Sequence, residues 1–201
     1  MRALFITTWA MLLACMSCHS GGSVRGVSAT SSVSYDLVLV PDASFFSGCG
    51  QSFACRLARL RALRSGVKMW KEVSPDIPVS ISVAATDSAR TVSVRIDPDH
   101  CILSTEQEKK FKEKKLKVLA CYKEEMSSIL VLNEKNVLPH VLAHEIGHAL
   151  GLDHHPDKVF RALMSEPAGA EILAVDMAVL CKSYPWLAGC LLTRESQLSA
   201  R

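Results

Sequence analysis

Four of the seven histidines in this 201-residue chain lie within residues 144–155, which read HEIGHALGLDHH. His144 and His148 are four residues apart, so on a helix their imidazoles project from one face, one turn apart, and can reach the same ion. Glu145 is rotated by about 100° from His144 around a helix with ~3.6 residues per turn. Its carboxylate can therefore lie beside the ion without binding it, and can accept a proton from a water molecule there.

The residues after this helix supply a third ligand. Gly151 can adopt the left-handed conformation that ends a helix sharply, which lets the chain bring His154 back to the ion. His155 competes for that place, but the spacing from Gly151 favours His154, and we expect His140 to be structural. Three neutral histidines leave one position of a tetrahedral Zn²⁺ open, as in catalytic sites, whereas structural sites are closed by four protein ligands. The sequence thus predicts one catalytic zinc ion whose water ionises near neutral pH.

These residues resemble the metzincin metallopeptidases, whose motif HExxHxxGxxH is followed by a methionine turn. The turn would be ALMS at residues 162–165, and the resemblance makes Met164 a hydrophobic floor beneath the zinc. The short distance from His154 to Met164 looks most like the matrixin branch, and a weaker resemblance extends to VKMWKEVSP at residues 67–75 and LAVDM at residues 173–177. This resemblance implies a metalloendopeptidase that binds a protein or peptide substrate in extended form against an edge strand.

Further features bear on the resemblance. Asp176 matches an aspartate that ties the last helix to the methionine turn in the family, although a plain surface carboxylate fits the sequence equally well. Ser165 and Glu166 precede Pro167 where matrixins usually have a tyrosine, so the pocket for the residue after the scissile bond differs. Residues 97–128 hold no acidic, glycine-rich calcium loops, and no inhibitory cysteine motif precedes the first strand. Calcium is therefore not expected, nor is activation beyond export.

Apolar periodicity outlines the elements that must hold this site. Alternating or continuous apolar runs predict strands, apolar residues at helical spacing predict helices, and their order indicates an α+β or α/β fold with a mixed sheet. The predicted strands are 35–40, 79–83, 92–96 and 128–132, and the predicted helices are 55–73, 106–122 and a metal-binding helix capped by Asn136 with Pro139 in its first turn. We expect the 92–96 or the 128–132 strand to be the edge that receives substrate.

Charge and composition limit the partners. The formal net charge of +3 is too small for the strong basic field typical of nucleic-acid binding, so no such partner is predicted. Residues 106–122 are rich in lysine, with acid–base pairs at i, i+4 spacing that suit the solvated face of a helix; a patch for acidic partners or anionic lipid is the alternative. We expect a monomer, with residues 35–201 as one catalytic domain.

The first residues indicate export. Residues 1–14 combine Arg2 with a short apolar run, which is too short to span a bilayer and predicts a signal peptide. The run ends in LLAC, which resembles a bacterial lipoprotein box and implies that Cys15 becomes the lipidated first residue of an envelope lipoprotein. Cys18 is a poorer alternative, and a plain secretory signal would give a secreted protein without an anchor. Residues 15–34 are rich in serine and glycine and predict a flexible tether.

Six of the eight cysteines lie beyond the tether, an even set that suggests disulfides in an exported chain. Sequence alone cannot choose among the possible pairings, and we predict that nearest neighbours pair: Cys49–Cys55, Cys101–Cys121 and Cys181–Cys190. The alternative is that several of these cysteines are buried thiols. A cysteine metal site is not favoured, because no CxxC pair occurs outside the signal region.

Two other functions fit the same motif. A zinc-dependent peptide-binding module would keep the metal and the partner without catalysis, but the intact Glu145 argues against it. A structural envelope lipoprotein would need a fourth ligand, for which His155 is the nearby candidate. Cleavage of peptides that stops when a chelator is added would distinguish the enzyme from both alternatives.

Overall fold

The computed structural model describes residues 36–85, 89–101, 109, 112–113, 117–155, 162–165 and 168–191. These residues all fall in the second of the two units into which the chain divides, Ser34–Arg201. The predicted signal peptide, the tether and Cys15 lie outside the described residues, as do Glu166 and Pro167. No helix within the described part of the chain is long and apolar enough to cross a membrane.

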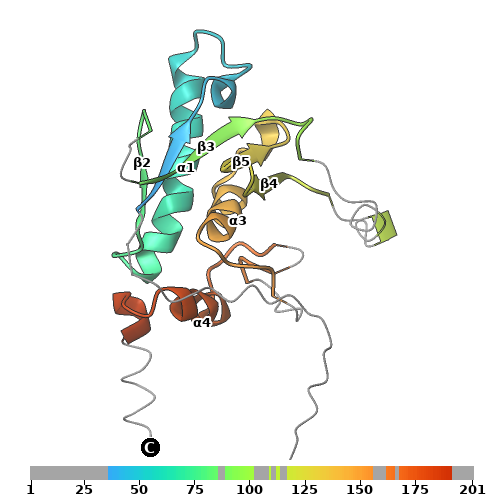
Figure 1. Ribbon diagram of the computed structural model, residues 1–201. Helices are drawn as coiled ribbons and strands as arrows, with labels where there is room; N and C mark the ends of the chain where they lie inside the picture. The colour runs from blue at the N-terminus through green and yellow to red at the C-terminus, as the bar shows by residue number, and fades with distance from the viewer. Residues whose placement is uncertain are drawn as a thin grey trace, which may run out of the picture. The chain divides into compact units, whose positions relative to one another are not determined.

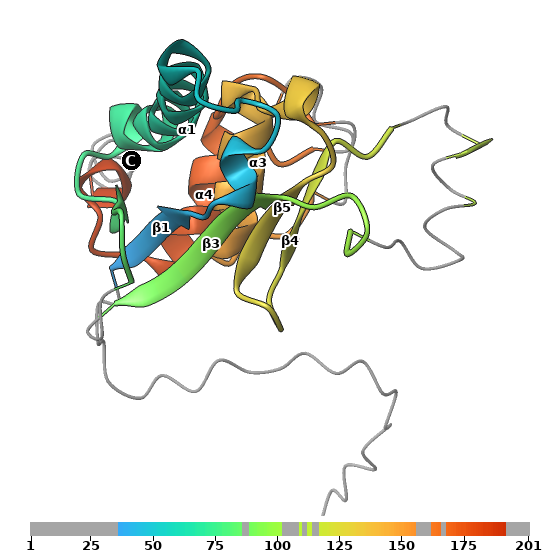
Figure 2. The same ribbon diagram turned by 90° about the horizontal axis from the view of Figure 1, so that it is seen from above.

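A five-stranded mixed sheet forms one layer of this unit (Figures 1 and 2). Its strands are β1 (Leu37–Pro41), β2 (Val79–Ile81), β3 (Arg90–Ile96), β4 (Ala120–Lys123) and β5 (Ser128–Val131). They lie in the order β2-β1-β3-β5-β4, with β4 antiparallel to β5 and every other neighbouring pair parallel. β5 is buried along its whole length, as expected of an apolar run inside a sheet. The predicted α+β fold with a mixed sheet is confirmed.

Two helices pack against each other on one face of the sheet (Figure 2). They are α1 (Phe53–Val73) and α3 (Pro139–Ala149). The helices approach closely at Gly66, where a Cβ atom would lie 3.1 Å from the backbone nitrogen of Ala143. Nearby, Nε1 of the fully buried Trp70 donates a hydrogen bond of 2.8 Å to the carbonyl of Ala143. α1 therefore fixes the position of the helix that carries the predicted metal ligands.

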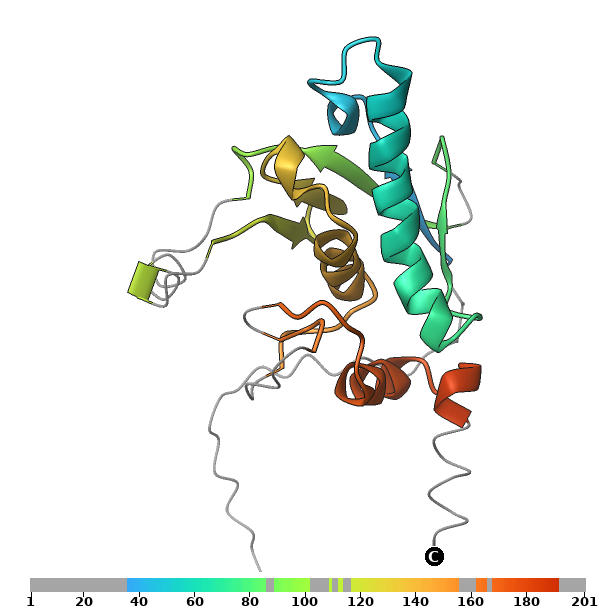
Figure 3. The ribbon, with the colours of Figure 1, turned by 180° about the vertical axis from the view of Figure 1, so that it is seen from behind.

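Other helices in the described part of the chain are α4 (Ala174–Ser183) and the short 3-10 helices η1 (Ser44–Phe46) and η2 (Glu134–Asn136). α4 lies near the C-terminal ends of α1 and α3 (Figure 3). The hydroxyl of Tyr184, just after α4, donates to the carbonyl of Leu150 at the end of α3. The backbone of Ala188 donates to the carboxylate of Asp76, just after α1. These bonds join the C-terminal part of the described chain to both long helices.

Two predictions about the sheet are wrong. In the described sheet the edge strands are β2 and β4, whereas residues 92–96 lie in the interior strand β3 and residues 128–131 form the interior strand β5. Residues 120–122, at the end of the predicted lysine-rich helix, lie in β4, and much of that segment falls outside the described residues. Charge pairs at i, i+4 favour a helix locally, but here the pairing of β4 with β5 decides the conformation.

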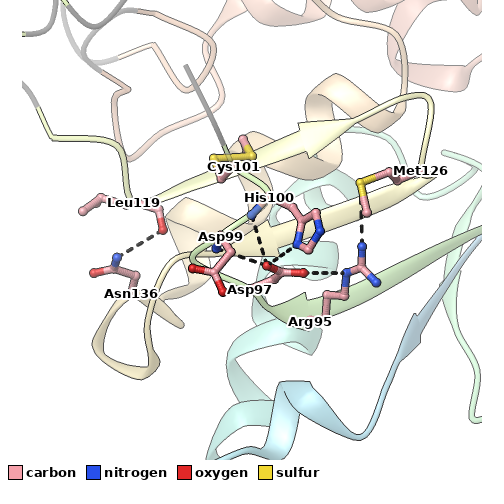
Figure 4. Close-up of a disulfide and its surroundings, with 9 residues drawn as sticks. Arg95, Asp97, Asp99, His100, Cys101, Leu119, Met126 and Asn136 are labelled. Carbon is pink, nitrogen blue, oxygen red and sulfur yellow. Dashed lines mark hydrogen bonds and ion pairs between the residues drawn. A yellow bond between two sulfur atoms is a disulfide. The ribbon is translucent and has the colours of Figure 1, made fainter. Parts of the chain in front are cut away.

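Three disulfides join the cysteines that are nearest in sequence: Cys49–Cys55, Cys101–Cys121 and Cys181–Cys190. Figure 4 shows the second of these, which ties the chain after β3 to the edge strand β4. Beside it, the carboxylate of Asp97 accepts hydrogen bonds from the backbone of Asp99 and of His100. This turn and the disulfide fix where the chain leaves β3 and connect that point to β4.

Candidate metal centre

α3 begins at Pro139, with Leu138 in the capping position and no side-chain cap. The predicted cap, Asn136, lies in η2, and its Nδ2 donates a hydrogen bond of 3.1 Å to the carbonyl of Leu119. The predicted cap is wrong because Leu138, not Asn136, occupies the position before Pro139, whose fixed φ already suits the first turn of a helix. The amide of Asn136 instead joins the entry of α3 to the residue before β4 (Figure 4).

The functional side chains on and after α3 differ in their exposure to solvent. Residues 141–147 are all buried, including His144 at 7% and Glu145 at 5% relative exposure. His148 is half-buried, and His154, beyond the helix, is exposed. Exposure therefore increases from His144 through His148 to His154, so a molecule that binds beside them has contact with solvent on the side of His154.

The three histidines converge through their Nε2 atoms. Nε2 of His154 lies 3.0 Å from Nε2 of His144 and 3.2 Å from Nε2 of His148. Nδ1 of His144 lies 2.6 Å from the carbonyl oxygen of Leu163, and Nδ1 of His148 lies 2.7 Å from that of Leu152. A carbonyl oxygen only accepts hydrogen bonds, so both Nδ1 atoms carry the proton, and the Nε2 atoms of both neutral rings present lone pairs.

This arrangement fits a zinc ion. Zn–N bonds of ~2.0–2.1 Å in a tetrahedral site place the ligand nitrogens about 3.3 Å apart, close to the distances observed here. Carbonyl oxygens that accept from Nδ1 fix the orientation of each ring, as is usual for histidines that bind metals. The group of His144, His148 and His154 could hold a metal ion, and three protein nitrogens leave a tetrahedral position for a small ligand.

Burial also sets the charge of the histidines. Burial lowers the pKa of His144 from 6.5 to about 3, and the neighbouring His148 adds to the effect. The pKa of His148 is lowered too, mainly by burial. Both imidazoles are therefore neutral near pH 7, which is the form that binds a metal.

Glu145 follows His144 in α3, and its carboxyl group accepts a hydrogen bond from the backbone N–H of Tyr122 in β4. Burial raises the pKa of its carboxyl group from 4.5 to about 8, against a smaller lowering by the backbone N–H of Tyr122 in β4. Within the described residues, no hydrogen-bond partner reaches its Oε2 atom. A buried carboxyl oxygen without a partner is unfavourable. Oε2 is therefore available to a water molecule or a ligand that binds at this site.

The chain leaves α3 through a sharp turn, as predicted. Gly151 has φ 89°, a left-handed conformation that favours glycine. The backbone N–H groups of Gly151 and Leu152 donate to the carbonyls of His148 and Gly147. These bonds close the end of the helix, so the next residues turn back along it and His154 reaches the other two histidines.

Residues 162–165, the predicted methionine turn, pack against α3. Met164 is fully buried, and a Cβ atom on Gly147 would lie only 2.4 Å from its Sδ atom. Gly147 lies between His144 and His148 in sequence, so the thioether contacts α3 within the turn that presents the histidines. The turn itself is closed by a hydrogen bond of 2.7 Å from Oγ of Ser165 to the carbonyl of Ala162.

Asp176, in the first turn of α4, is fully buried. Its carboxylate accepts hydrogen bonds from the backbone of Leu163, Met164 and Leu173. Its Oδ1 atom also lies 2.7 Å from Nε2 of His155. Of the two interpretations of Asp176, the structure supports the tie between the last helix and the methionine turn. The ring of His155 is engaged by Asp176 and lies outside the group of three histidines.

Sequence reasoning missed two residues that contact this site, Tyr122 and Arg90, and one partnership between residues that it had named. Tyr122 could not be found, because its strand was interpreted as part of a helix. Arg90, at the start of β3, binds the carbonyl of Ala149 in α3 and the hydroxyl of Tyr122, and nothing in its local sequence indicates that role. The partnership of His155 with Asp176 links residues 21 positions apart in sequence, a relationship that periodicity does not reveal.

A helix with two of three converging histidines, a sharp exit to the third and a methionine turn packed against the helix define the arrangement of metzincin-type zinc peptidases. The family model described as Matrixin matches residues 86–178 of this chain, from just before β3 into α4. No curated protein in our comparison matches the chain. The Matrixin match and the histidine group together support a matrixin-like metzincin.

Proposed function

We propose that this chain is a zinc-dependent metalloendopeptidase. In this proposal His144, His148 and His154 bind one zinc ion, Glu145 is the general base, and Met164 forms the hydrophobic floor of the site. The observation that carries the proposal is the convergence of three imidazole nitrogens beside a buried carboxyl oxygen that has no partner among the described residues. A structural zinc site is closed by four protein ligands and does not need a carboxyl oxygen that is kept without a partner.

Zinc bound to the imidazoles would polarise the scissile carbonyl and lower the pKa of a water molecule to roughly 7. In its ionised form, which the positive charge of a bound zinc ion would favour, Glu145 accepts a proton from the attacking water on Oε2, and the carboxyl group then gives that proton to the nitrogen of the leaving amine. The water oxygen bonds to the carbonyl carbon as the C–N bond breaks, so atoms and charge balance. His144 and His148 keep their Nε2 lone pairs available because their Nδ1 protons are held by backbone carbonyls.

We infer that the substrate binds as an extended strand along β4. Within the described sheet β4 is an edge strand that pairs only with β5, so its outer backbone groups can pair with a peptide. β4 is also the strand whose Tyr122 N–H is directed at Glu145. A peptide added to this edge would pass beside the general base. β4 thus takes the place of the two interior strands expected from sequence.

The proposal is tested with Glu145→Gln. This variant keeps the volume of the side chain but cannot accept the proton, so kcat should fall by about 10²–10⁴-fold on a peptide library. Zinc content, measured by inductively coupled plasma mass spectrometry, should remain at the wild-type level. The matched control is Glu125→Gln, an exposed residue in the turn after β4, which should keep full activity.

Three outcomes decide the matter. Chelator-sensitive cleavage by the wild type, lost in Glu145→Gln only, supports the peptidase. Zinc binding without cleavage of any peptide would favour the peptide-binding alternative. Retention of near wild-type activity in Glu145→Gln would remove Glu145 from the mechanism.

We also propose that the chain is exported to a bacterial envelope and anchored by lipid on Cys15. The three disulfides support an oxidising compartment, since such bonds are rare in the cytosol. Mass spectrometry of the mature N-terminus should find a diacylated Cys15. A diacylated Cys18 would move the anchor, and an unmodified residue further along the chain would make the protein secreted.

A further inference from the structure

Arg90 joins two elements of the proposed active site. Its Nη1 atom donates a hydrogen bond of 3.0 Å to the carbonyl of Ala149, in the last turn of α3. Its Nη2 atom donates one of 2.5 Å to the hydroxyl of Tyr122 in β4. We propose that Arg90 is a positioning residue that fixes the edge strand β4 against the metal-binding helix α3. The effect on catalysis rests on the proposed peptidase function, whereas the effect on β4 does not.

The first contact of Arg90 holds the end of α3. The last four carbonyls of a helix have no partner within the helix, and positive charge is favourable there. Arg90 supplies both a donor and a charge at Ala149, while the hydroxyl of Tyr184 supplies a donor to Leu150. Ala149 directly follows His148, so these bonds hold the turn that presents a proposed zinc ligand.

The second contact of Arg90 holds β4. The guanidinium lies 5.9 Å from the centre of the Tyr122 ring, in addition to its bond with the hydroxyl. The backbone N–H of the same residue is directed at the carboxyl group of Glu145. The side chain of Tyr122 is thus held by Arg90 while its backbone contacts the proposed general base. A shift of β4 would change that contact and move the edge on which the substrate pairs.

The topology explains why a side chain is needed for this link. β5 lies between β3 and β4, so no backbone ladder connects Arg90 to Tyr122. The two Nη atoms of a guanidinium project in fixed, different directions and can bind two partners at once. A lysine at this position would carry the charge but lacks this planar fork. The single side chain of Arg90 therefore connects β3 with both β4 and α3.

The matched control is Arg95, on the same strand. Its guanidinium contacts the carboxylate of Asp97 and Sδ of Met126 (Figure 4), at 3.6 Å and 3.8 Å, and has no part in the proposed site. Arg90→Met and Arg95→Met thus remove the same charge from the same strand. Only the first removes the link between α3 and β4.

The first experiment needs no metal and no activity. Amide hydrogen exchange is followed by NMR in the metal-free full chain for Arg90→Met, Arg90→Lys, Tyr122→Phe and Arg95→Met. In Arg90→Met the Tyr122 amide should exchange at least about tenfold faster, while the amide of Leu39 in β1 stays protected. Arg95→Met should leave both amides unchanged. Unchanged exchange at Tyr122 in Arg90→Met, or equal acceleration throughout the chain, would overturn the proposal.

The second experiment uses the zinc-loaded protein. Arg90→Met should lower kcat by about tenfold with KM changed less than ~threefold, and Arg90→Lys should recover part of the loss. As a single variant, Tyr122→Phe should lower kcat. Combined with Arg90→Met it should cause no further loss, because the two residues act as one unit. The positioning role would be overturned if the kcat losses of the two single variants multiplied in the double variant. It would also be overturned if Arg90→Met lost zinc in proportion to its loss of kcat. If the wild type cleaves no peptide, the proposed function fails, and the exchange result still decides the role of Arg90.

Discussion

Nε2 of His155 lies 2.7 Å from Oδ1 of Asp176, and only 4% and 0% of these two side chains are exposed. Its neighbour in sequence, His154, directs Nε2 at His144 and His148 instead. Adjacent histidines thus serve opposite sides of one segment, as successive side chains of an extended chain do. The backbone N–H of His155 also donates to the carbonyl of Met164. One histidine belongs to the metal group, and the next joins its segment to the methionine turn and α4.

This division predicts different defects for the two histidines. His154→Phe should weaken zinc binding by more than ~100-fold, because it removes a proposed ligand. The same change should have little effect on the free energy of unfolding of the metal-free protein, since His154 is exposed. His155→Phe should lower that free energy by about 1–3 kcal/mol, because the buried Asp176 loses a donor. Zinc titration by calorimetry and urea unfolding in chelator measure the two quantities.

The opposite pattern would reverse the assignment of the two residues. Strong loss of zinc binding in His155→Phe together with a normal affinity in His154→Phe would make His155 the third ligand. Asp176→Asn is the companion variant for His155, because it keeps the shape of the partner and alters only the acceptor.

A substitution at Gly147 tests the contact between α3 and the methionine turn. A methyl group there would lie 2.4 Å from Sδ of Met164 and 3.0 Å from Cζ2 of Trp70. Trp70 is held by its hydrogen bond to Ala143, so Met164 must move. Overpacking should outweigh the gain in helix propensity, and Gly147→Ala should lower the free energy of unfolding by about 1 kcal/mol.

The second step uses a variant that makes room. In a Met164→Ala background the added methyl should be neutral or stabilising, which urea unfolding of the single and double variants would show. An equal loss in both backgrounds would mean that Met164 does not pack on Gly147 in solution.

The raised pKa of Glu145 predicts a pH dependence in the metal-free protein. Between its usual pKa of 4.5 and the folded value of about 8, the folded chain keeps a proton that the unfolded chain releases. Stability from this group is therefore present below pH 4.5 and is lost as the pH rises towards 8. Glu145→Gln removes the effect, so the variant should gain more than ~1 kcal/mol on the wild type across this range.

Urea unfolding in chelator at several pH values measures that gain. The lowered pKa of His144 gives an opposite slope below pH 6.5, but it is present in both proteins and largely cancels in the difference. A difference between variant and wild type that does not change with pH would contradict the raised pKa.

The sequence predicted most of the metal group because its determinants are local. The spacing of His144 and His148 places both rings on one face of a helix, and Gly151 marks the exit that the structure shows with φ 89°. The mixed sheet and α1 also followed from apolar periodicity, with small errors at their ends. The nearest-neighbour cysteine pairs named from sequence are the disulfides of the structure, although spacing alone could not have excluded other pairings.

The errors concern contacts between distant segments. β4 was interpreted as the end of a helix, because lysine and glutamate pairs fit a helix and the pairing with β5 depends on the hairpin turn. The edge of the sheet was placed wrongly for the same reason, since strand order is not a local property. The cap at Asn136 failed because Leu119, its actual partner, lies 17 residues away. Tyr122 and Arg90 became visible only once α3, β3 and β4 had been placed.

X-ray absorption at the zinc K edge of the purified protein reports on whether three imidazoles hold a zinc ion that keeps a place for water. We expect three nitrogen ligands at about 2.0 Å with imidazole scattering, plus one oxygen ligand. Four nitrogen or sulfur ligands from the protein, or a purified and zinc-equilibrated chain that binds no metal, would contradict this expectation.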